Sequence, residues 1–380
     1  MNARVYLDYN ATAPIRPEAS AAVLRALEIG GNPSSIHAAG RAARAAIEEA
    51  REAVAALAGA QASQVVFTSG GAEANTLAMD SGLRLGGGAG LIVGATEHAS
   101  ISEAAEVSPA MTETWPVGGD GIADISWLGR RLDDWKAEDG RPFVALMLAN
   151  NETGVIQPVM QAAEMVREAG GWLHVDAVQA AGKIAVDMVA LGADTLALSA
   201  HKLGGPQGSG ALIVGPRVAL TKRNFGGGQE RGRRGGTENL SGIAGFGAAA
   251  RATHVGEVNA AWRDAAAERL KREAGVTILG EAAQRLPNTL CFAAEGYASE
   301  LQVMALDLAG VMVSAGSACS SGKVKGSHVV KAMGRADLAG CALRVSGGWA
   351  STRDDWERFV EAWLAGHARH LVRRPALVEA

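Results

Sequence analysis

The sequence predicts an α/β protein in which a doubly wound, mostly parallel sheet is accompanied by a smaller α+β domain. The chain has 380 residues, which suits two domains of roughly 100–200 residues each. It contains 49 glycines, many of them at the ends of apolar runs, as expected of tight turns between strands and helices. Short apolar runs alternate with helical stretches as far as residue 214. This alternation is typical of a parallel sheet with crossover helices.

The expected elements follow in order along the chain. The clearest helix covers 40–57, an Ala-rich stretch with Glu and Arg at helical spacing. The buried parallel strands are expected at 65–68, 91–94, 143–148, 172–175, 195–198 and 211–214. Beyond residue 255 the helices become longer and more charged, with strands expected at 289–292, 311–314 and 343–346. We therefore expect a large domain over 16–254 and a small domain formed by 1–15 and 255–380.

Composition excludes several classes of protein. With 48% hydrophobic and 20% charged residues, the chain is neither disordered, collagen-like nor a coiled coil, and it has no apolar run of membrane-spanning length. A net charge of -4 argues against nucleic acid as a partner. The first residues lack the apolar core of a signal peptide, so we expect a soluble cytoplasmic protein. The 3 cysteines form no CxxC pair, so neither a zinc site nor a disulfide scaffold is expected.

Polar side chains follow five of the expected strands, and ligands of open parallel sheets bind at these carboxyl ends. The candidates are Gly70-Gly71, His98, Asn151, Asp176 with Gln179, and Ser199 with His201 and Lys202. Each has an ordinary alternative: a plain helix start for the glycines, a helix cap for Asp176, a surface lysine for Lys202. Together they match pyridoxal phosphate, which needs a lysine for its aldehyde, an acid for its ring nitrogen and a phosphate site.

Two further residues carry possible chemistry. Cys319 lies among small residues in the stretch 314–322, which favours an exposed nucleophile, whereas Cys291 and Cys341 are expected to be structural. Arg344 can bind a substrate carboxylate through its guanidinium, and its alternative is an arginine on a strand surface.

Ordered motifs along nearly the whole chain resemble one family, the pyridoxal-phosphate-dependent cysteine desulfurases of the nitrogen-fixation and iron–sulfur-cluster type, within the class V aminotransferases. These motifs are Tyr6–Thr12, Gly31–Ser35, Phe67–Gly71, Glu97-His98, Ala149–Gly154, Asp176–Gln179, Ser199–Lys202, Gly226–Glu230, Gly235–Asn239, Gly316–Ser321 and Arg344–Ser346. The resemblance implies the aspartate-aminotransferase fold (fold type I of pyridoxal-phosphate enzymes) and a homodimer. It also implies removal of sulfur from L-cysteine, giving L-alanine and a persulfide on Cys319.

The resemblance also implies individual roles. Lys202 would bind the cofactor covalently, His98 would stack on its ring and move protons, Asp176 would hold the ring nitrogen, and Gln179 the ring hydroxyl. The phosphate would be bound by Gly71, Ala72, Ser199 and His201, with Thr237 supplied by the partner subunit. Asn151, also expected at the cofactor, and Arg344 would hold the substrate carboxylate. Ala72 departs from the family, which usually has threonine there, so one phosphate hydroxyl is missing.

The sulfur would pass from Cys319 to an iron–sulfur scaffold or another acceptor protein. Two other readings stay open at this point. One is a selenocysteine lyase or another class V enzyme, which the choice between L-cysteine and L-selenocysteine would separate. The other is a non-catalytic assembly partner, against which the joint presence of Lys202, Asp176, His98 and Cys319 argues.

Overall fold

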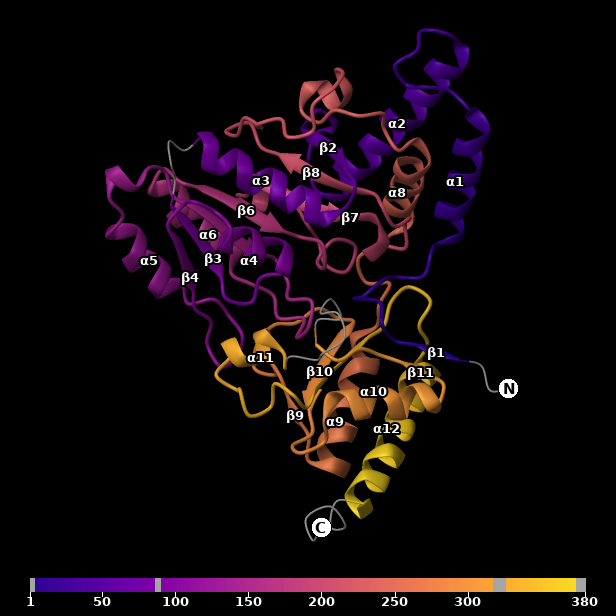
Figure 1. The fold of residues 1–380 in the computed structure, drawn as a ribbon. Coiled ribbons are helices and arrows are strands. Elements are labelled where there is room, and N and C mark those ends of the chain that lie inside the picture. The colour runs from indigo at the N-terminus through magenta and orange to yellow at the C-terminus, as the bar shows by residue number, and fades with distance from the viewer. Residues whose placement is uncertain (1–3, 86–89, 317–325, 374–380) are drawn as a thin grey trace.

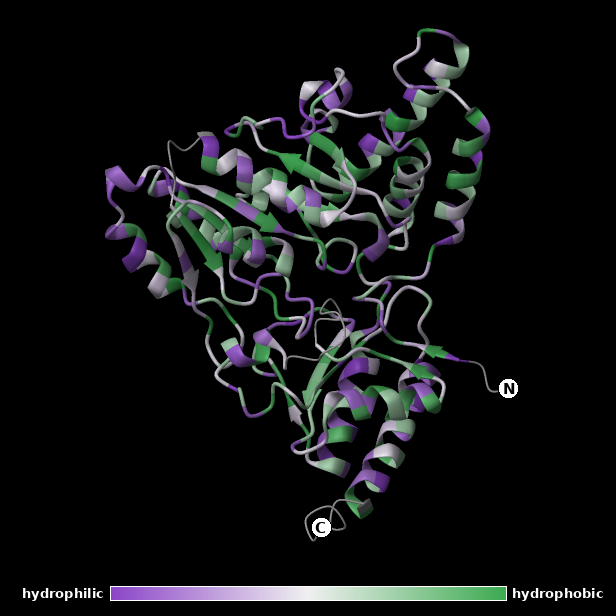
Figure 2. Cartoon of the chain, viewed as in Figure 1, coloured by the Kyte–Doolittle hydropathy of each residue, from purple (hydrophilic) through white to green (hydrophobic). Residues whose placement is uncertain are grey.

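The computed structural model describes residues 4–85, 90–316 and 326–373. Figure 1 shows two lobes, the upper one built around a large sheet and the lower one around small sheets and long helices. The strands of the large sheet are mostly hydrophobic and lie inside the upper lobe, whereas polar residues gather on the outer helices (Figure 2).

The upper lobe contains a seven-stranded sheet in the order β2-β8-β7-β6-β5-β3-β4. Its strands are β2 (Val65–Thr68), β3 (Leu91–Gly94), β4 (Thr112–Trp115), β5 (Phe143–Met147), β6 (Trp172–Asp176), β7 (Thr195–Ser199) and β8 (Gly210–Val214). Its helices are α1 (Pro17–Ile29), α2 (Ala38–Leu57), α3 (Gly71–Leu85), α4 (Ala99–Glu106), α5 (Ile125–Asp133), α6 (Val159–Glu168), α7 (Met188–Leu191) and α8 (Leu240–Ala252).

Both faces of this sheet are covered, as expected of a doubly wound fold. Alternate residues of β2 illustrate this, because Val65 and Phe67 pack with α2 and α8, while Val66 packs on the other face with α3. Six predicted strands agree with the structure to within about one residue at each end. The edge strand β4 was not predicted, because three of its four residues are at least partly exposed and it forms no apolar run.

The direction predicted for one strand is wrong. The segment 211–214 was expected to run parallel to its neighbours, but β8 pairs antiparallel with both β2 and β7. Only residues 200–209 connect β7 to β8. A parallel crossover needs a connection of about a dozen residues or more, usually containing a helix, so this short link returns the chain in the opposite direction.

The lower lobe has its own core and two small sheets. The strands β9 (Thr277–Ile278), β10 (Thr289–Ala293) and β12 (Ala342–Ser346) form an antiparallel sheet, and β1 (Val5–Tyr6) pairs in parallel with β11 (Val311–Met312). Its helices are α9 (Ala260–Ala274), α10 (Ser299–Leu308), α11 (His328–Ala332) and α12 (Arg353–Arg373). Leu290, Phe292, Phe359 and Trp363 are at the centre of this core. The exact division at residues 15/16 and 254/255 stays a prediction.

The N-terminal segment links the two lobes. After β1, Asp8 forms a bridge with Ser346 in the lower lobe, and Ala13 then donates its N–H to the His201 carbonyl in the upper lobe. Residues 9–12 therefore run between the lobes, where Figure 1 shows the indigo chain crossing. No helix in the described ranges is long and apolar enough to cross a bilayer.

Candidate active site

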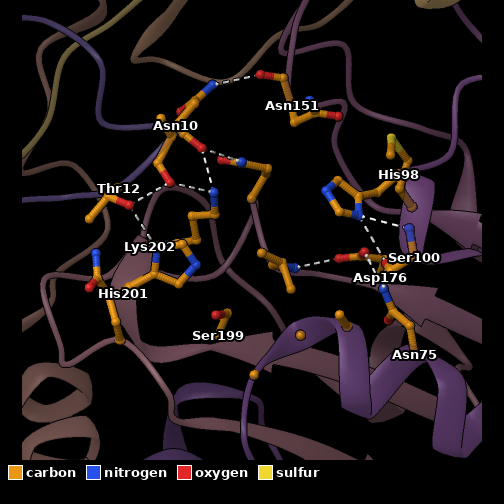
Figure 3. Close-up of a pocket in the computed structure, with 18 of the residues that line it drawn as sticks. Asn10, Thr12, Asn75, His98, Ser100, Asn151, Asp176, Ser199, His201 and Lys202 are labelled. Atoms are coloured by element: carbon orange, nitrogen blue, oxygen red, sulfur yellow. Dashed lines mark hydrogen bonds between the residues drawn. The ribbon is translucent and has the colours of Figure 1, made fainter. Parts of the chain in front are cut away.

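A cavity of about 530 Å³ opens at the carboxyl ends of the central strands, between the two lobes. Its lining includes the predicted residues Gly71, Ala72, His98, Asn151, Asp176, Gln179, Ser199, His201, Lys202 and Arg344. The sheet topology explains this gathering, because β2, β3, β5, β6 and β7 all end at the same edge. Figure 3 shows the labelled side chains around this space, with Asp176 and His98 on one side and Lys202 on the other.

The carboxylate side of the cavity is fixed by a chain of hydrogen bonds within the upper lobe. Asp176, at the end of β6, is 6% exposed and accepts from Asn75 Nδ2 at 2.8 Å and from the Val178 N–H at 2.9 Å. Because Asn75 donates to Asp176, its Oδ1 accepts from Nε2 of His174 at 3.0 Å. Nδ1 of His174 in turn lies 2.8 Å from the Thr195 hydroxyl. Asp176 is therefore held at the sheet and does not cap a helix.

Burial determines the charge of the histidines on this side. Desolvation lowers the pKa of His174 to about 4, so its imidazole is neutral near pH 7 and can donate from one nitrogen while accepting at the other. Desolvation also lowers the pKa of His98, although the negative charge of Asp176 opposes this shift. His98 is the N-cap residue of α4, and its Nδ1 accepts from the Ser100 N–H at 3.1 Å. A neutral, anchored ring is thus presented to the cavity.

The amine side of the cavity depends on the N-terminal segment. Lys202 lies in the 3-10 turn that follows β7, and its Nζ donates to the carbonyl oxygens of Asn10 at 2.6 Å and Ala11 at 2.8 Å. Next to it, Nδ1 of His201 lies 3.1 Å from the Thr12 hydroxyl. Burial first, and then the neighbouring charge of Lys202, lower the pKa of His201 to about 4. His201 is therefore a neutral hydrogen-bonding group here.

The floor of the cavity has the features of a phosphate site. The helix α3 begins at Gly71, and the first N–H groups of a helix have no partner within it, so they can bind an anion. A Cβ on Gly71 would lie 2.8 Å from Cγ2 of Val178, so a side chain there would force a rearrangement. Ser199 lies at the end of β7, on the same floor.

Two residues on the lower-lobe side of the cavity carry polar atoms that have no partner among the described residues. Arg344 on β12 is only 3% exposed, so a strand-surface arginine is the wrong interpretation. Its guanidinium donates to Asp8 Oδ1 at 2.9 Å and to the Asn151 carbonyl at 3.2 Å. Arg344 Nε and Asn151 Oδ1 are buried without a hydrogen-bond partner in the described part of the chain. Such atoms are costly unless a ligand satisfies them.

These residues fit pyridoxal phosphate. The cavity volume lies within the range of small-molecule sites, and it combines an amine, a fixed carboxylate, a neutral imidazole and a helix N-terminus. Among the described residues, no group of three or more His, Cys, Asp or Glu is placed to hold a metal ion.

The described lining of the cavity does not include three predicted functional or structural residues. Thr237 is exposed and does not line the cavity of its own chain. Cys319 lies outside the described residues. Cys291 is buried in the lower lobe, where burial raises the pKa of its thiol far above the usual value, as expected of a structural cysteine.

Sequence reasoning missed several residues that shape the site, among them Asn10, Asn75, His174 and Lys183. The motif Tyr6–Thr12 contains Asn10 and so carried a signal, but it gave no contact for the asparagine side chain. Nothing in the local sequence marks the other three. The partners of Asn75 and His174 come from distant segments, and Lys183 joins the nearby Gln179 to Asn10 near the start of the chain.

Comparison with known proteins identifies the class. The family model described as Aminotransferase class-V matches residues 5–359, and the chain belongs to this family. The expected resemblance and the α/β fold are thereby confirmed.

Within that class, the chain is similar to proteins named cysteine desulfurases. A cysteine desulfurase of Cereibacter sphaeroides is 44% identical over 340 residues, covering 87% of each chain. The cysteine desulfurase IscS of Dictyoglomus turgidum is 36% identical over 375 residues, covering 93% of this chain and 92% of the relative. Among solved structures, a NifS-like protein from Rickettsia africae superposes with a TM-score of 0.88 at 31% identity, covering 96% of this chain and 99% of the other.

Proposed function

We propose that this protein is a pyridoxal-phosphate-dependent cysteine desulfurase, which removes sulfur from L-cysteine and leaves L-alanine and a persulfide on Cys319. The observation that carries the proposal is the arrangement of Lys202 and Asp176 on two sides of one cavity (Figure 3). Arg344 and Asn151 line the same cavity, and each has a buried polar atom without a partner among the described residues. The names of the relatives support the same activity.

Different residues around the cavity hold different parts of the cofactor. Pyridoxal phosphate, when bound, supplies a conjugated ring that accepts electrons from the substrate Cα. Lys202 attaches it, Asp176 keeps its ring nitrogen protonated and Gln179 contacts its ring hydroxyl. The first turn of α3 at Gly71 and Ala72 binds the phosphate, together with Ser199, His201 and Thr237 from a second copy of the chain. His98 stacks against the ring.

The substrate is held and deprotonated by other residues of the same cavity. Arg344 and Asn151 line the cavity and hold the substrate's α-carboxylate, and Arg344 Nε and Asn151 Oδ1 have no hydrogen-bond partner among the described residues. Lys202, once released from the cofactor, or His98 removes the Cα proton. The Cys319 thiolate then attacks the substrate sulfur. A sulfur–sulfur bond forms, the carbon–sulfur bond breaks, and its electron pair remains with the carbon that becomes the alanine methyl group.

The family resemblance extends the proposal to partners and location. We infer a cytoplasmic homodimer in which each active site uses Thr237 from the other subunit. The persulfide sulfur is passed to an iron–sulfur scaffold or another acceptor protein.

Turnover of L-cysteine by the purified, cofactor-loaded protein tests this proposal. The expected result is a yellow protein that forms alanine in proportion to the sulfur released, with L-cysteine preferred over L-selenocysteine. A clear preference for L-selenocysteine would identify a lyase of the alternative kind. A colourless protein that forms no alanine would favour the non-catalytic assembly partner and overturn the proposal.

A further inference from the structure

A second lysine, Lys183, is buried directly behind Lys202. It lies in the segment between β6 and α7, and it is only 9% exposed. The main cavity is lined by Lys202 but not by Lys183, and both line a small crevice on the far side of Lys202. Burying an amine costs free energy unless the amine is hydrogen-bonded, so the contacts of Lys183 need an explanation.

The amine of Lys183 has two partners, and both are side-chain amides of the site. Its Nζ donates to Gln179 Oε1 at 2.7 Å and to Asn10 Oδ1 at 3.0 Å. On the other side of the same amide, Gln179 Nε2 donates to the Asn10 carbonyl at 3.0 Å. That carbonyl also accepts from Lys202 Nζ. Asn10 is thus the shared neighbour of both lysines.

These contacts determine which end of the Gln179 amide can bind a ligand in the cavity. Its oxygen faces Lys183, and one of its two N–H hydrogens is taken by the carbonyl of Asn10. The second N–H is therefore the group that Gln179, a lining residue, has left to offer a ligand. The amine of Lys183 has hydrogens for both of its bonds whether it is charged or neutral.

We propose that Lys183 is a positioning residue for cofactor binding: by holding the amide oxygen of Gln179, it directs the remaining Gln179 N–H toward the ring hydroxyl of pyridoxal phosphate. The inference rests on the proposed function. A donor aimed at this ring oxygen stabilises its deprotonated form. The donor thereby lowers the pKa of the Lys202 nitrogen that is bound to the cofactor.

Replacing Lys183 by methionine removes the donor while keeping a long side chain. Gln179 Oε1 is then buried without its partner, and the amide turns away to recover a hydrogen bond. The expected result is that the pH at which the visible absorbance of the lysine-bound cofactor changes rises by about one unit. Binding of pyridoxal phosphate to the apoprotein should weaken several-fold. The exposed Lys136, far from the cavity lining, provides the control Lys136→Met, which should behave as wild type.

A double-mutant cycle separates this role from general support of the fold. Gln179→Met alone should shift the transition in the same direction, and Lys183→Met should add nothing to it in the double variant. Lys183→Gln, which keeps an N–H donor, should restore part of the wild-type value and also serves if the methionine variant does not fold. Additive shifts, or a Lys183→Met transition equal to that of Lys136→Met, would overturn the inference. A wild-type protein that binds no pyridoxal phosphate would instead overturn the proposed function.

Discussion

The carboxylate side and the amine side of the cavity are built in different ways. Among the described residues, Asp176 is held by the upper lobe, through Asn75 on α3, which His174 on the strand of Asp176 supports in turn. Lys202 instead contacts carbonyls of the N-terminal segment, at Asn10 and Ala11. Asn10 is itself fixed by the lower lobe, because its side chain donates to Thr289 at 2.9 Å and its N–H to Ser346 at 3.0 Å.

This difference shows that one half of the site is formed by the sheet and the other by the docking of two lobes. Under the proposed function, a carboxylate that keeps a ring nitrogen protonated benefits from a rigid, buried position. Under the same proposal, a lysine that leaves the cofactor and returns benefits from uncharged hydrogen-bond partners. Carbonyl oxygens of a crossing segment provide these without a carboxylate that would hold the amine in its charged form.

The largest expected effect separates the two sides directly. Lys202→Ala should abolish the covalent link to the cofactor and lower the rate of desulfuration by about 10³-fold or more, because the base and the attachment point are both lost. Asp176→Ala should keep the covalent link but slow the reaction by about 10²-fold or more, because the ring nitrogen loses its partner. Visible spectra and alanine formation measure both. Normal activity of the Lys202 variant would refute the assignment.

Under the proposed function Cys319 takes the sulfur and does not hold the cofactor, so its removal should leave cofactor binding intact. We expect Cys319→Ala to keep the cofactor spectrum and its response to L-cysteine while forming no persulfide. Cys291→Ala is the matched control, since this thiol is buried in the lower lobe and should not take part. Mass spectrometry of the protein after reaction with L-cysteine locates the added sulfur. Sulfur found on Cys291 would show that the wrong thiol was chosen.

The carboxylate side should also weaken in acid. The pKa of His174 is lowered from 6.5 to about 4 in the folded protein, so the unfolded chain binds its proton first. The stability that depends on the neutral ring is therefore complete above pH 6.5 and is lost as the pH falls toward 4, by up to about 3 kcal/mol.

Urea denaturation over this pH range measures the loss of the free energy of unfolding. In His174→Gln this free energy should fall less steeply with decreasing pH. His201, with a similarly lowered pKa, contributes in the same direction and remains in the variant. An identical slope in wild type and variant would mean that protonation of His174 is not what weakens this side.

The smallest effect concerns Ala72, at the phosphate end between the two sides. A threonine there adds one hydroxyl near the first turn of α3, where Ala72 is exposed to the cavity. One hydrogen bond contributes a net of roughly 0.5–1.5 kcal/mol, or about two- to twelvefold in affinity. Ala72→Thr should therefore tighten binding of pyridoxal phosphate several-fold, with little change in rate at saturating cofactor. Titration of the two apoproteins side by side measures this, and equal or weaker binding would show that Ala72 does not face the phosphate.

The sequence predicted the carboxylate side better than the amine side, for a physical reason. Asp176 follows an apolar run, and the rule that parallel strands end at one edge places it beside His98 and Lys202. The contacts of Asn10 with Thr289 and Ser346 join residues far apart in the chain, and no local pattern encodes them. The reversed direction of β8 likewise depended on the length of a connection rather than on hydrophobic periodicity.

The identity of the lysine that carries the cofactor tests the account most directly, because two lysine amines share Asn10 as a neighbour. Reduction of the cofactor-loaded protein with borohydride, followed by peptide mapping, fixes the cofactor on the lysine that binds it. We predict the pyridoxyl group on Lys202 and none on Lys183. A pyridoxyl group on Lys183, or on no lysine at all, would contradict the account.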